Sequence, residues 1–278
     1  MRRNDIVVLD GAMGTKLWEK ASDKAPVWRY NITNPAIVSE VTREYVEAGA
    51  EVVQANTFGA NRFAAQREGY DVAELVSTAV RLAKAEAGDR AKVGLDIGPL
   101  PVMMEPYGDL TEEEAAEAFR EMIAPGVEAG ADLIWFETFM DADMLRVAVE
   151  TAAEFNLPIL ATMTFTEVGK TIMGHSVEYF VEAMEGLPVT ALGINCSLGP
   201  EMAVPIIASF EKYTDLPLIF KPNAGKPVVV DGETKVEFDI DTFVNDCAPA
   251  LEHNVKYIGG CCGSDPDYIR ALIRLVRG

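Results

Sequence analysis

Short runs of apolar residues alternate along the chain with longer stretches in which apolar residues recur every three or four positions. The short runs are apolar throughout, which is typical of parallel strands that are buried on both faces. Eight such runs are found, at residues 6–10, 51–57, 92–98, 133–138, 159–165, 191–196, 218–223 and 257–262. The longer stretches predict amphipathic helices; within 36–48, for example, Ile37, Val41 and Tyr45 share one helical face.

Two helix starts can be recognised in the sequence. The segment from Thr111 to Glu114 predicts a capping box, in which the threonine hydroxyl and the glutamate carboxylate satisfy free N–H groups. Asp265 and Pro266 predict the start of the last helix, with the aspartate as N-cap and the proline in the first turn.

The order of these elements indicates the fold. Eight strand–helix units in 278 residues predict an α/β protein, a single (β/α)8 TIM barrel that occupies residues 1–278 as one domain. A doubly wound open sheet is the alternative. The chain has no internal repeat beyond this rhythm and no low-complexity linker that would divide it.

One segment interrupts the rhythm after the seventh apolar run. Residues 227–238, PVVVDGETKVEF, place Asp231 and Gly232 between two runs of β-forming residues, which predicts a β-hairpin insertion. Barrels build their active sites on the loops at this end of the strands. The hairpin is expected either to act as a lid or, as we favour, only to cover the barrel mouth.

Composition excludes several classes of protein. The chain has 24 basic and 44 acidic residues, and its net charge of −20 disfavours nucleic acids and anionic membranes as partners. No apolar run approaches the roughly 20 residues of a membrane span, and the N-terminal apolar run is too short for a signal peptide. Four cysteines do not form a disulfide framework, so we expect a reduced, cytoplasmic protein.

Polar residues gather where the predicted strands end, which is where barrel enzymes place their chemistry. The first run ends at Asp10, which is followed by Gly11 and Ala12. The fourth ends with Glu137, and the seventh ends at Asn223. We therefore expect a functional site at this end of the barrel.

Three cysteines occupy such strand ends. Cys196 closes the sixth run, and Cys261 and Cys262 close the eighth, so the barrel would bring them together. Three thiolates suit zinc and leave a fourth position open, as in catalytic zinc sites. The alternative is that all three are small buried hydrophobic residues. Cys247 lies within a helical pattern and is predicted to be a core residue.

The two histidines are weaker candidates. His175 lies near the start of the helix after the fifth run, close enough to reach the site, and His253 precedes the last run at the opposite end. Capping or surface roles are expected for both rather than metal binding.

Five segments, in order along nearly the whole chain, resemble one enzyme family. They are LDGAMGTKL (9–17), AGAEVVQANTFGANRF (48–63), GINCSLGPEM (193–202), KPNAG (221–225) and GGCCGSDPDYI (259–269). These segments are similar to motifs of the zinc-dependent homocysteine S-methyltransferases. Their residues most resemble those of the homocysteine-binding module of cobalamin-dependent methionine synthase.

The resemblance implies a metal site. Zinc would be held by Cys196, Cys261 and Cys262, with the sulfur of homocysteine as the fourth ligand. Asn223 matches a residue close to the metal that fills the open position when substrate is absent. Zinc deprotonates a coordinating thiol, and three cysteinate ligands keep the bound homocysteine sulfur nucleophilic.

The resemblance also implies substrate contacts. Asp10 and Glu137 match positions that hold the amino group of homocysteine, and backbone amides around Gly11 and Ala12 would meet its carboxylate. Capping of strand ends is the alternative role for the two acidic residues.

The family divides by methyl donor. This chain contains no second barrel and no corrinoid-binding segment of the DxHxxG type. The resemblance therefore implies methylcobalamin carried by a separate corrinoid protein as the donor, with methionine as the product. The alternatives are a small donor such as betaine or S-methylmethionine, and a catalytically inactive protein that binds zinc or thiols.

Overall fold

The computed structural model describes residues 5–230 and 233–278, and within 226–238 it describes the backbone alone. Eight parallel strands form one sheet in the order β1-β10-β7-β6-β5-β4-β3-β2. A bridge between Leu9 and Val52 joins the two ends of this order into a barrel. The strands are β1 Val7–Val8, β2 Val52–Gln54, β3 Lys92–Ile97, β4 Leu133–Phe139, β5 Ile159–Met163, β6 Val189–Asn195, β7 Leu218–Lys221 and β10 Val255–Ile258.

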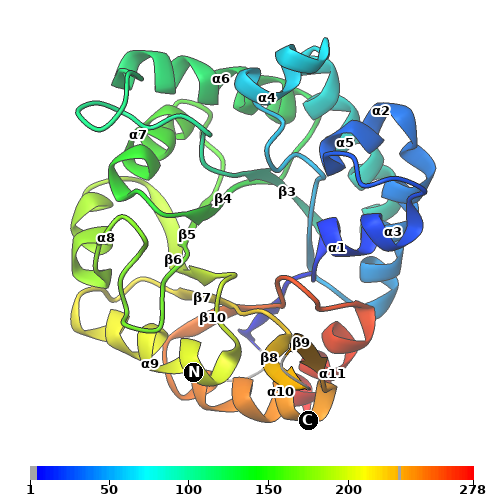
Figure 1. The fold of residues 1–278 in the computed structure, drawn as a ribbon, viewed down its shortest axis with the longest axis vertical. Helices are drawn as coiled ribbons and strands as arrows, with labels where there is room; N and C mark the ends of the chain where they lie inside the picture. Colours follow the sequence, from blue (N-terminus) through cyan, green and yellow to red (C-terminus); the bar gives the residue numbers. More distant parts are fainter. Residues whose placement is uncertain (1–4, 231–232) are drawn as a thin grey trace.

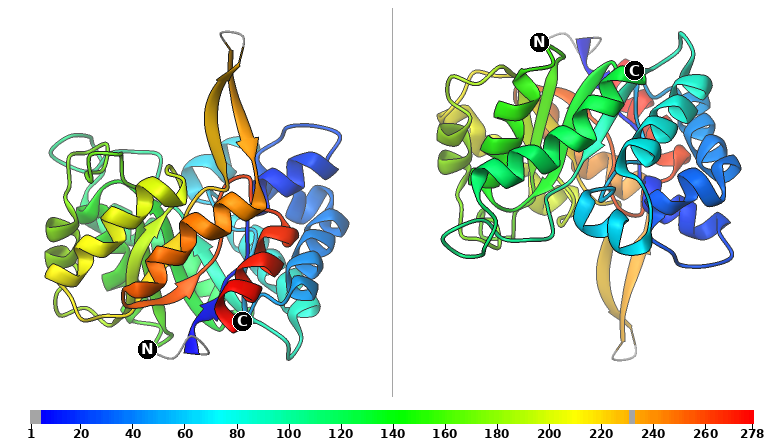
Figure 2. Two further views of the ribbon diagram at one scale, coloured as in Figure 1. Left: turned by 90° about the horizontal axis from the view of Figure 1, so that it is seen from below. Right: turned by 90° about the horizontal axis from the view of Figure 1, so that it is seen from above.

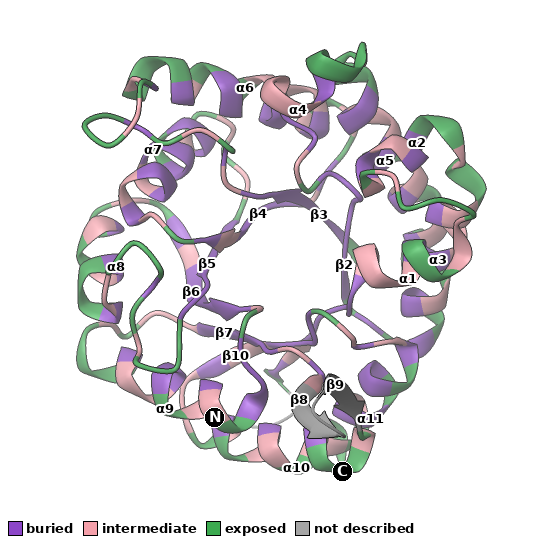
Figure 3. Ribbon diagram, in the orientation of Figure 1, coloured by how far each residue is buried: buried purple, intermediate pink, exposed green. Residues whose placement is uncertain are grey.

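Helices surround the barrel, as Figure 1 shows in a view along its axis. They are α1 Met13–Lys20, α2 Tyr30–Thr33, α3 Pro35–Ala48, α4 Arg62–Ala65, α5 Val72–Ala87, α6 Glu112–Glu128, α7 Ala142–Ala153, α8 Val177–Ala183, α9 Pro200–Ser209, α10 Ile240–Cys247 and α11 Pro266–Arg277. The strands are buried and the outer helix faces are exposed (Figure 3). The predicted α/β TIM barrel is therefore confirmed, and the open sheet is not observed.

The helix starts follow the local rules of the sequence. Thr111 and Glu114 form the predicted capping box at the start of α6. Asp265 caps α11, where it accepts the N–H groups of Asp267 and Tyr268. Cys247 is fully buried at the end of α10, which confirms that it is a core residue. None of the described helices is both long and apolar enough to span a membrane.

Two layers of side chains fill the barrel, because side chains at every second position of a strand point to the same face. The lower layer is apolar and consists of Leu9, Val52, Leu133, Trp135, Leu160, Ala191 and Ile219. Two residues further along four of these strands the side chains are polar: Gln54, Glu137, Thr162 and Lys221, all of them buried. The period of the strands therefore places a polar layer above an apolar one.

Two further strands follow β7. Strands β8 (Gly225–Val230) and β9 (Glu233–Phe238) pair in antiparallel register, and Figure 2 shows them extending away from the barrel. Residues 231 and 232, which carry the predicted turn, lie outside the described residues. The turn of the predicted hairpin insertion, and its role as lid or cover, therefore remain predictions.

Candidate active site

The three cysteines at the strand ends converge on one point. Cys196 directly follows β6, whereas Cys261 and Cys262 lie in the loop between β10 and α11. Their sulfur atoms all lie within 4.8 Å of one another, and those of Cys196 and Cys262 are 3.7 Å apart. Tetrahedral coordination with metal–sulfur bonds of about 2.3 Å requires sulfur atoms about 3.8 Å apart. The donor set and its spacing therefore fit a zinc ion.

The chain turns sharply at the first of these cysteines. Cys196 and Ser197 have φ angles of 60° and 55°, in the left-handed region that residues other than glycine seldom adopt. The Cys196 N–H donates to the Lys221 carbonyl, so the end of β6 stays attached to β7 through this turn. Such strain is characteristic of functional sites that the surrounding structure enforces.

Without a bound cation, the three thiols remain protonated at neutral pH. The Cys261 side chain lowers the pKa of Cys196, but the hydrogen bond with Cys262 and burial outweigh it and bring this pKa to about 11. For Cys262 the Cys196 side chain lowers the pKa, whereas Cys261 and burial raise it to about 12. A divalent cation is the group that would turn such a set into thiolates.

Asn195 connects this cluster to the neighbouring strands. Its Oδ1 accepts the Thr138 N–H and the Thr162 hydroxyl, both at 2.8 Å. Its Nδ2 donates to Thr138 Oγ1 at 2.8 Å and lies 3.9 Å from the Cys261 sulfur. The side chain is 1% exposed. Asn195 therefore holds the end of β4, the inner face of β5 and one thiol in a fixed relation.

A second cluster, of carboxylates and one ammonium, lies deeper in the barrel. The Asp10 Oδ2 atom accepts the Gln54 backbone N–H at 2.7 Å, and Glu137 Oε2 accepts the Gln54 side-chain amide at 2.9 Å. Lys221 Nζ donates to Gln54 Oε1 and lies 3.3 Å from Asp10 Oδ1 and 3.7 Å from Glu137 Oε2. Asp10 and Glu137 are therefore brought together, as predicted, around a buried cation that the sequence analysis did not single out.

Burial shapes the charges of this cluster. It opposes the charge of Lys221, which is 2% exposed, but Asp10 and Glu137 outweigh it and raise the pKa of the ammonium above its ordinary range. Burial raises the pKa of Asp10, and the charge of Lys221 counteracts this. Asp96, on the inner face of β3, lies close enough to interact electrostatically with Glu137, Lys221 and Asp10.

One cavity is lined by the three cysteines and by the carboxyl groups of Asp96 and Glu137. It has a volume of about 300 Å³. Its lining consists of Gly11, Ala12, Met13, Gly14, Thr15, Trp18, Val27, Gln54, Asn56, Phe58, Asp96, Glu137, Thr138, Cys196, Lys221, Cys261 and Cys262. Sulfur donors and buried carboxyl groups thus face one small space.

The backbone at Gly11 and Ala12, for which substrate contacts are predicted, lies just before α1. The Ala12 N–H donates to the Ser264 carbonyl at 3.0 Å. Gly11 is held against Ser264 and Tyr45 with no room for a Cβ atom. Among the described residues no side chain caps α1, and its first residues, Met13 and Gly14, line the cavity. The N–H groups of this first turn are better placed to meet an anion.

Asn223 lies beside the cysteine segment. Its backbone N–H donates to the Leu198 carbonyl, and the next residue, Ala224, donates to the Cys262 carbonyl. The Asn223 Oδ1 atom is buried and has no hydrogen-bond partner among the described residues. The asparagine therefore lies next to the loop that carries two of the thiols, with an acceptor atom to spare.

His175 belongs to another group of possible ligands, with Asp141 and Asp143. Its Nδ1 atom, however, accepts the N–H of Ala142 at 3.0 Å, at the first turn of α7. That nitrogen is therefore engaged in helix capping, which was the expected kind of role. His253 lies at 3.0 Å from Glu211 and is not part of either group.

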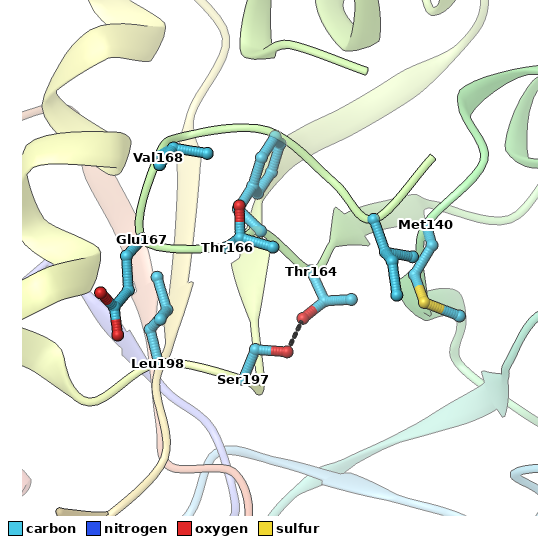
Figure 4. Close-up of a pocket in the computed structure, with 9 residues that line it drawn as sticks. Met140, Thr164, Thr166, Glu167, Val168, Ser197 and Leu198 are labelled. Atoms are coloured by element: carbon cyan, nitrogen blue, oxygen red, sulfur yellow. Dashed lines mark hydrogen bonds between the residues drawn. The ribbon is translucent and has the colours of Figure 1, made fainter. Parts of the chain in front are cut away.

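A second cavity of about 500 Å³ is lined by Ser197, the residue that follows Cys196 (Figure 4). Its lining is mainly apolar and includes Met140, Val168 and Leu198. The hydroxyl groups of Thr164 and Ser197 are 2.5 Å apart in it. Cys196 lines the first cavity, and the next residue in the sequence, Ser197, lines the second.

Comparisons with known proteins agree with this geometry. The methionine synthases of Mycobacterium tuberculosis (strain ATCC 25618 / H37Rv) and Mycobacterium leprae (strain TN) are 30% and 29% identical over 303 and 304 residues. Each alignment covers 98% of this chain and 24% of the relative, so the chain spans about a quarter of their length.

A solved structure shares the fold. The homocysteine methyltransferase MmuM from Escherichia coli, in its oxidized form, superposes with a TM-score of 0.82 at 24% identity, over 97% of this chain and 96% of that one. The family model described as homocysteine S-methyltransferase matches residues 7–276. The chain therefore belongs to the homocysteine S-methyltransferase family.

Proposed function

We propose that this protein transfers a methyl group to the thiol of homocysteine and forms methionine, with zinc bound by Cys196, Cys261 and Cys262. The observation that carries this proposal is the meeting of three sulfur donors, within 4.8 Å of one another, in a cavity that buried carboxyl groups also line. The sulfur donors would hold the metal that binds the substrate thiol. The carboxyl groups would bind the substrate amino group.

The chain's own thiols explain the need for the metal. Without a cation their pKa values lie at about 11 for Cys196 and about 12 for Cys262, so little thiolate would exist at neutral pH. Bound zinc supplies Lewis acidity, which favours the thiolate form of a coordinating substrate thiol. Asn223, with its spare acceptor atom, is proposed to lie close to the metal.

The remaining groups orient the substrate. Asp10 and Glu137 are proposed to hold the ammonium group, because both are buried carboxylates fixed by Gln54. The N–H groups of the first turn of α1, from Met13 onward, are proposed to hold the carboxylate. Fixing both ends of the amino acid would turn an encounter with the methyl donor into an oriented attack.

The proposed donor is a methyl-corrinoid on a separate protein. This part of the proposal rests on the similarity to methionine synthases, of which the chain covers 24%. We also propose that the reaction takes place in the cytoplasm, where free thiols persist. The alternative is a small methyl donor, such as betaine or S-methylmethionine, and the experiment below distinguishes the two kinds of donor.

The test uses purified, zinc-loaded protein with homocysteine and methylcobalamin, while the corrin spectrum and methionine are followed. We expect demethylation of the corrin with an equal amount of methionine. Cys261→Ala should abolish both zinc binding and transfer, whereas Cys247→Ala, in the core, should retain them. Equal zinc content in the two variants would contradict the ligand assignment. Methionine formed from betaine or S-methylmethionine without corrinoid would instead favour a small donor.

A further inference from the structure

Asn195 is a buried amide whose hydrogen-bonding groups are all in use. A primary amide has two N–H donors and a carbonyl oxygen that accepts two hydrogen bonds. The Oδ1 atom accepts the Thr138 N–H and the Thr162 hydroxyl, and the Nδ2 atom donates to Thr138 Oγ1, each at 2.8 Å. The Nδ2 atom also lies 3.9 Å from the Cys261 sulfur, within the range of an N–H···S hydrogen bond. The second N–H of the amide is therefore left for this sulfur.

The neighbours of the amide fix which of its ends faces the thiol. The backbone N–H of Thr138 is always a donor, so the amide atom that meets it must be the oxygen. The NH₂ group consequently lies on the side of Thr138 Oγ1 and Cys261. The sulfur therefore faces an N–H donor and not a carbonyl oxygen, which is the partner that a thiolate requires.

Strained backbone gathers around this asparagine. Among the described residues, four other than glycine have a positive φ angle, and three of them are Thr138, Cys196 and Ser197. Thr138 is β-branched, which makes its φ of 63° a marked outlier, and two hydrogen bonds from Asn195 hold it. Cys196 directly follows Asn195 in the sequence. Such conformations cost free energy and cluster at functional sites, so the surroundings of Asn195 have the character of a site.

Cys261 is the thiol that most needs a donor from the protein. It is 8% exposed, whereas Cys262 is exposed and Cys196 is half-buried. Water stabilises a thiolate poorly at a buried position, so a charged sulfur there depends on protein donors. Among the described residues, Asn195 supplies the one side-chain N–H within hydrogen-bonding distance of the Cys261 sulfur.

We propose that Asn195 is a positioning residue of the metal centre: its N–H orients the Cys261 sulfur and withdraws electron density from it. Groups that donate to metal ligands act in this way, because they fix the ligand and tune its donation to the metal. This inference rests on the metal site of the proposed function and deepens it. The other contacts of the amide hold the strained Thr138 turn, which lines the same cavity, so the metal centre and the end of β4 depend on one side chain.

The test uses cobalt(II) and zinc as probes of Asn195→Asp and Asn195→Ser. Aspartate keeps the size of the side chain and an acceptor for the Thr138 N–H but has no N–H for the sulfur, and serine is too short to reach it. Asn31→Asp is the matched control. Asn31 is equally buried and donates to the Asn56 and Leu75 carbonyls, but it does not line the cavity.

Three quantities are measured for every variant: the sulfur-to-cobalt charge-transfer band, the zinc affinity in competition with a chromophoric chelator, and the unfolding temperature of the metal-free protein. Both Asn195 variants should move the band to longer wavelength, because a thiolate without an N–H donor releases electron density more easily. They should also bind zinc about 10- to 100-fold more weakly. Asn31→Asp should lower the unfolding temperature, since it removes two buried hydrogen bonds, and should leave the band and the zinc affinity unchanged.

The outcomes separate this inference from the proposed function. Asn195 variants that lose thermal stability but keep the band and zinc affinity of the wild type would show that the amide only supports the scaffold, and would overturn the inference. A cobalt-loaded wild type without a sulfur charge-transfer band would overturn it together with the ligand assignment. A shifted band in the variants, with a wild type that forms no methionine from any donor, would support the role of Asn195 and contradict the proposed reaction alone.

Discussion

At the scale of single residues, the site depends on side chains that each serve several partners. Asn195 uses both ends of its amide to hold Thr138, Thr162 and the Cys261 sulfur. Gln54 joins Glu137 and Lys221 through the two ends of its amide, and its backbone N–H donates to Asp10. Such shared amides make the thiol and carboxylate clusters rigid, because no single contact can be released without leaving another buried group unpaired.

Lys221→Met tests the charge balance of the cluster. We expect the free energy of unfolding to fall by about 3 to 5 kcal/mol, because removing one partner of a buried ion pair leaves the others uncompensated. Adding Asp10→Asn should recover part of the loss, since it removes one of the unpaired charges. Urea unfolding of both variants measures this. A double variant no more stable than Lys221→Met would show that Asp10 is not a charge that the lysine compensates.

The pH dependence of stability tests the environment of Asp96. Burial first, and the charge of Glu137 second, raise the pKa of this carboxyl in the folded protein well above 3.8. The folded protein therefore holds a proton that the unfolded chain releases near pH 3.9. The stability linked to Asp96 is fully present below that pH and is lost as the pH rises through the folded-state pKa.

Asp96→Asn lacks this titration. Its advantage in unfolding free energy over the wild type should therefore grow as the pH rises above about 4. Urea unfolding of both proteins between about pH 4.5 and pH 8 measures the difference. A difference that stays constant over this range would mean that Asp96 titrates at its ordinary pKa.

At the scale of elements, the close approach of strand β6 to β7 depends on Gly193, which has no side chain. A Cβ atom added to Gly193 would lie 2.0 Å from the Ile219 carbonyl oxygen of β7. The strand therefore reaches Asn195 and Cys196 only because glycine lets β6 and β7 approach. The β3–β4 pair is less demanding, because a Cβ atom on Gly94 would come closest to the flexible Leu133 side chain, at 3.2 Å, and would reach Trp135 at 3.6 Å, an ordinary contact.

Gly193→Ala should consequently destabilise the protein by at least about 3 kcal/mol, the upper part of the range for overpacking. Gly94→Ala, the matched control, should cost clearly less, since the Leu133 side chain can move. Chemical denaturation provides the comparison. Equal losses in the two variants would show that the β6–β7 contact imposes no special constraint.

At the scale of the whole molecule, a bound metal would join segments far apart in the chain. Cys196 follows β6, whereas Cys261 and Cys262 follow β10. Cys261 comes 65 residues after Cys196 in the sequence. These sulfur atoms meet only when the barrel has closed, so metal binding and folding are thermodynamically linked.

Chelation of the metal from the zinc-loaded protein should therefore lower the midpoint of thermal unfolding by about 4 °C or more. Cys261→Ala should show no such response, whereas Cys247→Ala should respond as the wild type does. Differential scanning calorimetry with and without chelator provides the measurement. A midpoint that chelation does not change in the wild type would argue against zinc at the three cysteines.

Much of the candidate site could be predicted from the sequence because it follows the ends of strands. Asp10, Glu137 and the three cysteines each come directly at or after an apolar run, and local sequence is enough to place them at one end of a barrel. Lys221 was not expected, because it lies inside an apolar run and a lysine there gives no sign of its partners.

The sequence by itself determined the eight strand–helix units, the helix caps and the residues at the strand ends, because these depend on neighbours within a few positions. The tertiary structure alone decided which polar side chains meet. Lys221 and Gln54 are 167 residues apart in sequence. Their contact depends on the register in which the strands of the barrel pair, and that register is set by packing of the whole interior, which no local pattern specifies.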